Sequence, residues 1–212
     1  MLDFLIFIIP IILAYMLFFG IPAIAYKYYL KSMEYYLEKD YEKALKYSNR
    51  SILLDPKQAV VWNVRGLAWQ QLNQYKKALE DFNKALEIDP NRADTYGIRG
   101  HVLQLLGQYQ DAISDFSKAF TLDPDHAFAI NNRGLTWLYL GEHQKALEDF
   151  NKAIEMEPTY VSAFNNRGLA YKQLGQLDKA KADFEKALEF PPDEVQVKMI
   201  FLNFLSNIQR GT

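Results

Sequence analysis

The chain of 212 residues contains no cysteine, which excludes disulfides, thiolate zinc sites and a cysteine nucleophile. It also lacks a basic excess, because 24 Lys and Arg stand against 26 Asp and Glu, so nucleic acid is not expected as a partner. Its three histidines, His101, His126 and His143, are scattered along the sequence. No nucleophile elbow, phosphate-binding glycine loop or H-E-x-x-H helix occurs. These absences predict a protein that is not an enzyme and that uses no metal and no cofactor.

One long apolar run stands near the start of the chain. From Phe4 to Tyr26 there is no charged residue, and at about 1.5 Å per residue a helix over this run reaches about 34 Å, enough to cross a hydrocarbon core. Tyrosines and the two lysines Lys27 and Lys31 follow directly, which is the pattern of a membrane interface on its cytoplasmic side. The run therefore predicts a single membrane span through residues 4–26, with the bulk of the chain facing the cytoplasm.

A cleaved signal peptide is the alternative interpretation of the same run. Ala23-Ile24-Ala25 is an A-x-A triplet at its end. However, the first three residues contain no Lys or Arg, and the run is much longer than the apolar core of a usual signal peptide. Cleavage would place the rest of the chain outside the cytoplasm.

The rest of the sequence repeats every 34 residues. "NNRGL" occurs at Asn131–Leu135 and at Asn165–Leu169, and related pentapeptides stand one and two periods earlier. Prolines follow the same period, and when each is counted as position 32 of its repeat, four other positions recur. They are glycine at position 8 (Gly66, Gly100, Gly134, Gly168), alanine at 20 (Ala44, Ala78, Ala112, Ala146, Ala180), phenylalanine at 24 (Phe82, Phe116, Phe150, Phe184) and alanine at 27 (Ala85, Ala119, Ala153, Ala187).

This pattern of small, aromatic and small residues resembles the tetratricopeptide-repeat (TPR) family, and the resemblance covers about residues 25–192. It implies an all-α solenoid of helical hairpins. The first repeat departs from the pattern, with Ser32, Ser48 and Ser51 in place of the glycine, the aromatic and the second alanine. The predicted layout is a transmembrane helix at 1–26, a degenerate repeat at 25–58, further repeats at 59–92, 93–126, 127–160 and 161–192, and a C-terminal capping helix at 193–212.

The residues themselves also indicate two helices in each repeat. Apolar residues recur at three- and four-residue spacing in both halves of a repeat, for example in "AVVWNVRGLAWQQL" and "YKKALEDFNKALEI". Position 15 between the halves is Asn73, Gly107, Gly141 or Gly175, which favours a left-handed helix C-cap. The proline at position 32 ends the second helix, because the residue before a proline is disfavoured in helical geometry.

An arginine at position 7 and an aspartate at position 23 accompany each other in the last four repeats. The arginines are Arg65, Arg99, Arg133 and Arg167, and the aspartates are Asp81, Asp115, Asp149 and Asp183. Repeat 1 has Lys31 and Tyr47 instead. Because the two residues carry opposite charges and always occur together in these repeats, they predict an ion pair between the two helices of one repeat. An arginine ladder for an anionic ligand is the alternative.

Within the TPR family, positions 2, 5, 9, 12 and 13 of the first helix face a concave groove. The resemblance therefore implies a partner-binding groove in this chain, lined by Asn63, Gln70, Gln71, His101, Gln104, Phe128, Asn131, Leu135, Leu138, Tyr139, Asn165, Lys172 and Gln173. Side-chain amides can hydrogen-bond a peptide backbone, and the apolar members can hold a side-chain anchor. The alternative is that these residues only solvate the surface or belong to the core.

Together these features predict a membrane-anchored protein-interaction scaffold. It would bind a partner protein or peptide, plausibly a subunit of a membrane complex, and act in assembly of that complex or recruitment to it. Two other functions stay open, namely an extracytoplasmic TPR protein and a structural membrane protein that self-assembles through its apolar C-terminal helix.

Overall fold

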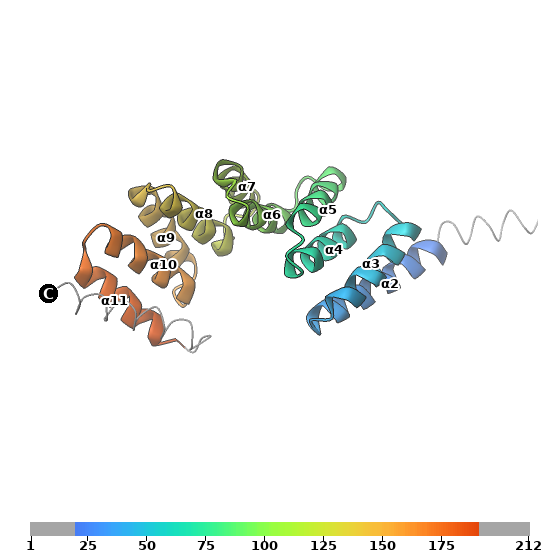
Figure 1. Ribbon diagram of the computed structural model, residues 1–212, viewed down its shortest axis with the longest axis horizontal. Coiled ribbons are helices and arrows are strands. Elements are labelled where there is room, and N and C mark those ends of the chain that lie inside the picture. Colours follow the sequence, from blue (N-terminus) through green and yellow to red (C-terminus); the bar gives the residue numbers. More distant parts are fainter. Residues whose placement is uncertain (1–19, 191–212) are drawn as a thin grey trace, which may run out of the picture. The chain divides into compact units, whose positions relative to one another are not determined.

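The computed structural model of the chain describes residues 20–190 and contains ten α-helices in that range (Figure 1). They form five consecutive hairpins, each made of a first helix (A) and a second helix (B). The hairpins are α2 (Ile21–Leu37) with α3 (Tyr41–Leu54), α4 (Ala59–Gln71) with α5 (Tyr75–Ile88), α6 (Ala93–Leu105) with α7 (Tyr109–Leu122), α8 (Ala127–Tyr139) with α9 (His143–Met156), and α10 (Val161–Gln173) with α11 (Leu177–Leu188).

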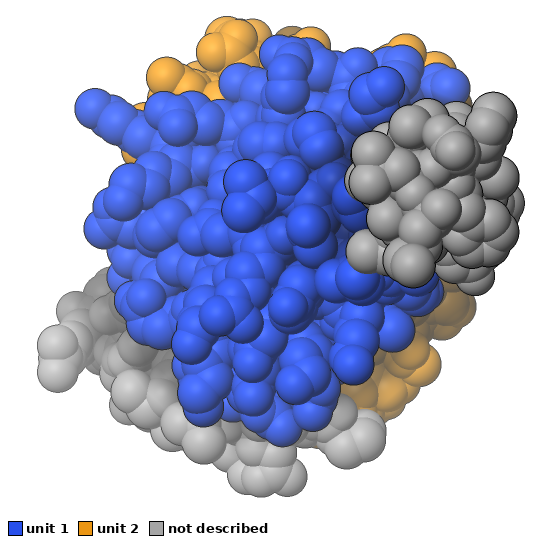
Figure 2. Space-filling view, turned by 90° about the vertical axis from the view of Figure 1, so that its right-hand side faces the viewer, with its two compact units in different colours: residues 1–95 blue, residues 96–212 orange. Residues whose placement is uncertain are grey.

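The chain divides into two compact units, Met1–Thr95 and Tyr96–Thr212 (Figure 2). The boundary falls in the first turn of α6, so α2 to α5 belong to unit 1 and α7 to α11 belong to unit 2. In unit 1, α3 packs against both α2 and α4. In unit 2, each helix from α7 to α10 packs against the next, and the A helices α8 and α10 also contact each other. The five predicted repeats are thus five helical hairpins, in an all-α fold.

The predicted membrane span is only partly covered by the structure. None of the helices found between residues 20 and 190 is both long and apolar enough to cross a bilayer. Residues 4–19 of the predicted span lie outside the described residues, as does the predicted capping helix at 193–212. The last residues of the apolar run, from Ile21 onward, form the first turns of α2. Helix A of repeat 1 therefore starts inside the run, without an intervening linker.

In the core of each later repeat, a phenylalanine ring of helix B packs directly against a glycine of helix A. Phe82, Phe116 and Phe150 are fully buried. A Cβ added to Gly134 would lie 2.8 Å from Cε1 of Phe150, and a Cβ added to Gly66 would lie 2.6 Å from Cε1 of Phe82. Such distances are too short for any real contact, so the glycine at position 8 is required by the aromatic at position 24.

Repeat 1 replaces this contact with buried serine hydrogen bonds. The hydroxyls of Ser32 and Ser48 lie 2.5 Å apart, and each donates to the carbonyl oxygen of Ala44. Ser51 donates to the carbonyl oxygen of Ala25 at 2.7 Å, which ties α3 to the start of α2. All three serines are fully buried. The small side chains thus let α2 and α3 pack closely without an aromatic between them.

The predicted ion pair between helices A and B is confirmed in all four later repeats. In each repeat the arginine donates through Nε and Nη2 to the two oxygens of one aspartate, at 2.6 to 2.8 Å. The four aspartates are buried, whereas each arginine side chain keeps about a fifth of its surface exposed. The hydrogen bond to the aspartate raises the pKa of Arg99, Arg133 and Arg167, so these pairs stay ionised.

The same arginines also reach the preceding repeat. Nη1 of Arg65 donates to Asn49, Nη1 of Arg133 donates to Ser117, and Nη1 of Arg167 donates to Asn151. Each acceptor stands at position 25 of the preceding repeat. One guanidinium therefore joins three helices, the two of its own hairpin and helix B of the hairpin before it.

The turns follow the sequence pattern. Position 15 has a positive φ at Asn73, Gly107, Gly141 and Gly175, as predicted for left-handed caps. Each B helix from α3 to α9 ends two residues before a proline, and the intervening residue is extended. Lys39, with a φ of 64°, stands at position 15 of repeat 1, so a left-handed residue occurs at this position in all five repeats.

We expect Gly134→Ala to destabilise the protein by about 1–2 kcal/mol. The new Cβ would collide with the Phe150 ring, and this overpacking outweighs the usual gain of about 0.5–1 kcal/mol from replacing glycine in a helix. Denaturant unfolding followed by circular dichroism measures the change. In a Phe150→Leu background the same substitution should cost less, because, of the close neighbours, only Cβ of Asp149, at 3.1 Å, then remains. An equal change in stability in both backgrounds would show that the ring does not demand the glycine.

Candidate functional site

The residues predicted to line the groove all lie on A helices, but on both units. Asn63, Gln70 and Gln71 lie on α4 in unit 1. The other ten lie on α6, α8 and α10 in unit 2, where α8 and α10 contact each other. Within each unit the candidate residues therefore share the A-helix layer, and unit 2 carries most of them.

The asparagines at position 5 are buried rather than open. Asn63, Asn131 and Asn165 are exposed by 7%, 3% and 7%. Oδ1 of Asn131 accepts a hydrogen bond from Nδ2 of Asn166 at 3.0 Å, which links α8 to α10. The Oδ1 atoms of Asn63 and Asn165 have no hydrogen-bond partner among the described residues. An unsatisfied buried amide costs about 1–3 kcal/mol, so these two oxygens lower the stability of the protein as it stands.

Gln104 and Leu138, at position 12, hold neighbouring repeats together. Nε2 of Gln104 donates to Oγ1 of Thr136 at 2.8 Å and to the carbonyl oxygen of Asn132 at 3.2 Å, and all three residues are buried. Leu138 is buried in the core between repeats 4 and 5, and Leu135 packs against that core. Gln104 and Leu138 therefore contribute to packing between repeats. For these two residues the alternative interpretation, that they belong to the core rather than to an open groove, describes the structure better.

Two of the predicted groove residues in unit 2 are both apolar and exposed, Phe128 and Tyr139, with 37% and 57% of their surface accessible. Leu105, exposed by 48%, belongs with them although it is absent from the predicted groove. It stands at position 13, as Tyr139 does, so the sequence contained the signal that identifies it. The ring of Tyr139 lies 5.7 Å from that of Tyr109. We name Leu105, Phe128 and Tyr139 the apolar A-helix patch.

Two histidines flank this patch. The ring centroid of Phe128 lies 6.2 Å from that of His101 and 6.1 Å from that of His126. Burial lowers the pKa of His101, so at neutral pH its ring is uncharged. Gly97, at the position where repeats 2, 4 and 5 have asparagine, leaves room for His126, whose Nε2 lies 3.3 Å from the place that a Cβ on Gly97 would take. The Phe128 end of the patch is therefore bordered by two imidazole rings, of which that of His101 is uncharged at neutral pH.

The remaining candidates form a polar surround. Gln70 and Lys172 are half-buried, and Gln71 and Gln173 are exposed. Tyr160 packs beside the same layer, and burial raises its pKa to about 12, so its hydroxyl stays protonated. Among residues 20–190 no group of three His, Asp or Glu side chains is placed to hold a metal ion.

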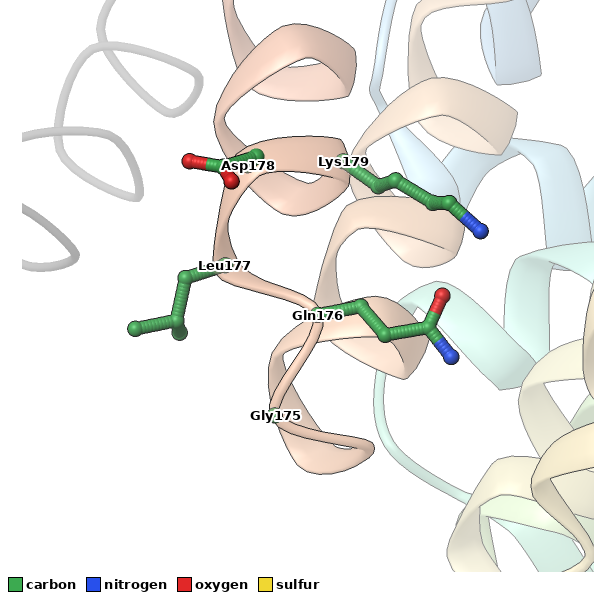
Figure 3. Close-up of a pocket in the computed structure, with 5 residues that line it drawn as sticks. All are labelled: Gly175, Gln176, Leu177, Asp178 and Lys179. Atoms are coloured by element: carbon green, nitrogen blue, oxygen red, sulfur yellow. The ribbon is translucent and has the colours of Figure 1, made fainter.

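A surface recess of unit 2 lies elsewhere, at the turn between α10 and α11 (Figure 3). A single segment, Gly175 to Lys179, lines it. In Figure 3, Leu177 and Asp178 point to one side of the turn, and Gln176 and Lys179 point to the other. The lining side chains diverge, so the recess does not enclose a ligand, and none of the predicted groove residues belongs to it.

Comparison with protein families gives consistent matches to tetratricopeptide repeats. Models described as tetratricopeptide repeat match residues 34–99, 93–126 and 161–193, and one described as TPR repeat matches residues 138–175. Together these matches cover well over half of the chain. No curated protein sequence matches it.

Several solved structures are similar in fold. MamA is 27% identical with a TM-score of 0.68, over 78% of this chain and 90% of MamA. YrrB, described as a TPR protein with an unusual peptide-binding site, is 26% identical with a TM-score of 0.65, over 83% of this chain and 89% of YrrB. PilW, described as a widely conserved type IV pilus biogenesis factor, is 25% identical with a TM-score of 0.77, over 88% of each chain.

We expect Gln104→Met to lower the free energy of unfolding by about 1–2 kcal/mol, because Thr136 and Asn132 lose a buried hydrogen-bond donor. The matched control is Gln173→Met, the same change at an exposed position of an A helix, which should alter stability by less than about 0.5 kcal/mol. Denaturant unfolding of both variants measures the difference. Equal effects would contradict the packing role given to Gln104.

Proposed function

This chain belongs to the tetratricopeptide-repeat family, and on that premise we propose that it is a protein-interaction scaffold that binds a partner peptide or protein on its A helices. Its hairpins supply a rigid surface, and the A-helix layer of unit 2 combines apolar side chains with amides. A peptide bound there would place its apolar side chains on the patch and its backbone against the asparagines. No side chain on this surface needs to carry out chemistry.

The observation that carries the proposal is the exposure of the apolar A-helix patch. Leu105, Phe128 and Tyr139 come from two consecutive A helices, α6 and α8, and each leaves more than a third of its surface accessible. The helices themselves are close, because Gln104 of α6 bonds Thr136 of α8. Phe128 stands in the first turn of α8 and Tyr139 at its last residue, so the exposed apolar side chains are spread along the A-helix layer, where an extended or helical peptide could contact them in turn. The peptide-binding site described for YrrB supports the same use of the fold.

One unpartnered acceptor adds specificity to the proposal. Asn165 of α10 lies in the same unit as the patch, and its Oδ1 has no partner among the described residues. This oxygen is buried, so a peptide backbone would reach it only where the neighbouring side chains move aside. Apolar anchors and a backbone-reading amide would then act together in unit 2.

The proposed location is a membrane surface. The uncharged run through residues 4–26 is long enough for a single span, and its last residues, from Ile21 onward, form the first turns of α2. Lys27 and Lys31 follow the run, which favours an array that faces the cytoplasm. In this arrangement the scaffold would hold its partner close to the bilayer and serve in the assembly of a membrane complex. The description of PilW as a pilus biogenesis factor is consistent with such a task.

The test is in-cell photocrosslinking from Tyr139, with Glu148 on the B helix α9 as the control site, since both positions are exposed. We expect one dominant partner to be captured from position 139 and not from position 148. Leu105→Ser should weaken that capture by about tenfold, the usual cost of removing an apolar anchor. Leu105 is half exposed, so this change leaves the fold intact.

Three results would contradict the proposal. One is equal capture from both positions, and another is capture that is insensitive to Leu105→Ser. The third is capture of the chain itself, which would favour the self-assembling protein instead.

A further inference from the structure

The first repeat has a different pair of residues where the later repeats have their arginine and aspartate. Position 7 is Lys31 and position 23 is Tyr47. Nζ of Lys31 lies over the Tyr47 ring, 5.4 Å from its centroid, so a cation–π contact stands where the later repeats have an ion pair. Repeat 1 therefore keeps the positive charge at this place and loses the negative one.

The surrounding side chains extend this into a cluster of tyrosines and cations on α2 and α3. Tyr35 stacks on Tyr47 with centroids 5.2 Å apart, and Tyr28 lies 6.1 Å from Tyr47. The guanidinium of Arg50 lies 5.7 Å from the Tyr28 ring and 5.5 Å from the Tyr47 ring. We name these five residues, Tyr28, Lys31, Tyr35, Tyr47 and Arg50, the tyrosine–basic face.

The later repeats show what this face would contact in the middle of an array. In repeat 2, the position-7 arginine, Arg65, bonds Asn49 of the preceding repeat. Trp69, at position 11, packs against Ala44 and Leu45 of that repeat. Position 7 therefore reaches the preceding hairpin, whereas position 11 also contacts its own hairpin, since Tyr35 packs against Ala44 and Leu45 as well. In repeat 1 the same positions belong to Lys31 and Tyr35, and the described residues contain no hairpin before α2. Within residues 20–190, the tyrosine–basic face therefore lies on the side of repeat 1 that no described hairpin covers.

The charge of this face is not compensated by carboxylates. Within residues 20–190, neither Lys31 nor Arg50 forms an ion pair, and their recorded partners are tyrosine rings. The nearby Asp40 is already occupied by Lys43, at 2.7 Å. Tyr28, Lys31, Tyr35 and Tyr47 are half-buried, and Arg50 is exposed. The face thus offers two cations set among aromatic rings, a composition that suits the headgroup region of an anionic bilayer.

We propose that the tyrosine–basic face docks on an anionic bilayer surface, with Lys31 and Arg50 against lipid phosphates and the three tyrosines at the headgroup level. This rests on the proposed function, since the apolar run through residue 26 would bring α2 to the bilayer. A second copy of the chain fits the face less well, because two such faces would bring like charges together. Docking would turn repeat 1 into the contact between the array and the membrane, in place of a preceding repeat.

The position of the docked hairpin can be measured with a fluorophore on a single cysteine, because the chain has none of its own. Glu38→Cys places the label at the far end of α2, whose 17 residues span about 25 Å. The labelled full chain is reconstituted into vesicles that contain a headgroup-labelled quencher lipid. One set is otherwise phosphatidylcholine alone, and the other contains about 30% phosphatidylglycerol, enough to give an anionic surface.

We expect quenching on the anionic vesicles and little on the neutral ones. Lys31→Gln with Arg50→Gln should reduce the ratio of docked to undocked chain about 25-fold, since each cation near an anionic surface contributes about fivefold. The matched control is Lys76→Gln with Lys118→Gln, which removes two exposed lysines and should leave quenching unchanged. Lys118 holds the same position in its repeat, position 26, as Arg50 does in repeat 1. Lys31→Arg with Arg50→Lys should also preserve the quenching. Circular dichroism verifies that every variant keeps its helices.

Quenching that is equal on both vesicles, or that is insensitive to the Lys31 and Arg50 substitutions, would overturn the proposal. So would an oligomer that those substitutions dissociate while the label stays unquenched, because the face would then bind a second copy. The proposed anchor has a separate readout, the retention of the chain on neutral vesicles after an alkaline wash. If the wash removes the chain from neutral vesicles, the proposed anchor is wrong. The comparison of Lys31→Gln with Arg50→Gln against the control pair on anionic vesicles still decides whether the face binds lipid.

Discussion

The guanidinium at position 7 is the interaction on which the array depends. The aspartate at position 23 is almost completely buried, and a buried carboxylate is tolerated only with a partner that satisfies both of its oxygens. Arginine does this with two donors in one plane and has a third donor left over for the preceding repeat. Each of the four later hairpins is thereby fixed internally, and Arg65, Arg133 and Arg167 each also attach their hairpin to the preceding one. The pairing of glycine with phenylalanine then sets how closely the two helices approach.

The first repeat shows what changes when this interaction is absent. Its helices are held by Ser32, Ser48 and Ser51 instead of an aromatic, and its outer end carries Lys31 and Tyr47 instead of the ion pair. Both departures concern the hairpin that follows the apolar run. Among residues 20–190 no hairpin precedes repeat 1, so no described repeat takes up the contact that the third donor of an arginine makes in the later repeats. Interaction with lipid at that end and with a partner on the A helices of unit 2 would give the scaffold two separate surfaces.

Periodicity allowed much of this fold to be predicted, because a 34-residue repeat fixes the place of each residue on its helix. The hairpins, the left-handed residues at position 15 and the ion pair all followed from it. The depth of a side chain did not follow, since it depends on the neighbouring repeat. Gln104 shares its position with Gln70, yet it is buried because Thr136 and Asn132 receive its hydrogen bonds. The contact of Arg133 with Ser117 was missed for the same reason. A membrane span through residues 4–26 stays a prediction.

The most direct test of the central claim is hydrogen exchange, measured by mass spectrometry, on Asp149→Asn. If Arg133 couples its own hairpin to the one before it, loss of the carboxylate should free the guanidinium from both and increase exchange in α8 and α9 and also in α7. The account predicts this spread into the preceding repeat. Faster exchange confined to α8 and α9, with α7 unchanged, would contradict it. Arg133 would then stabilise only its own hairpin.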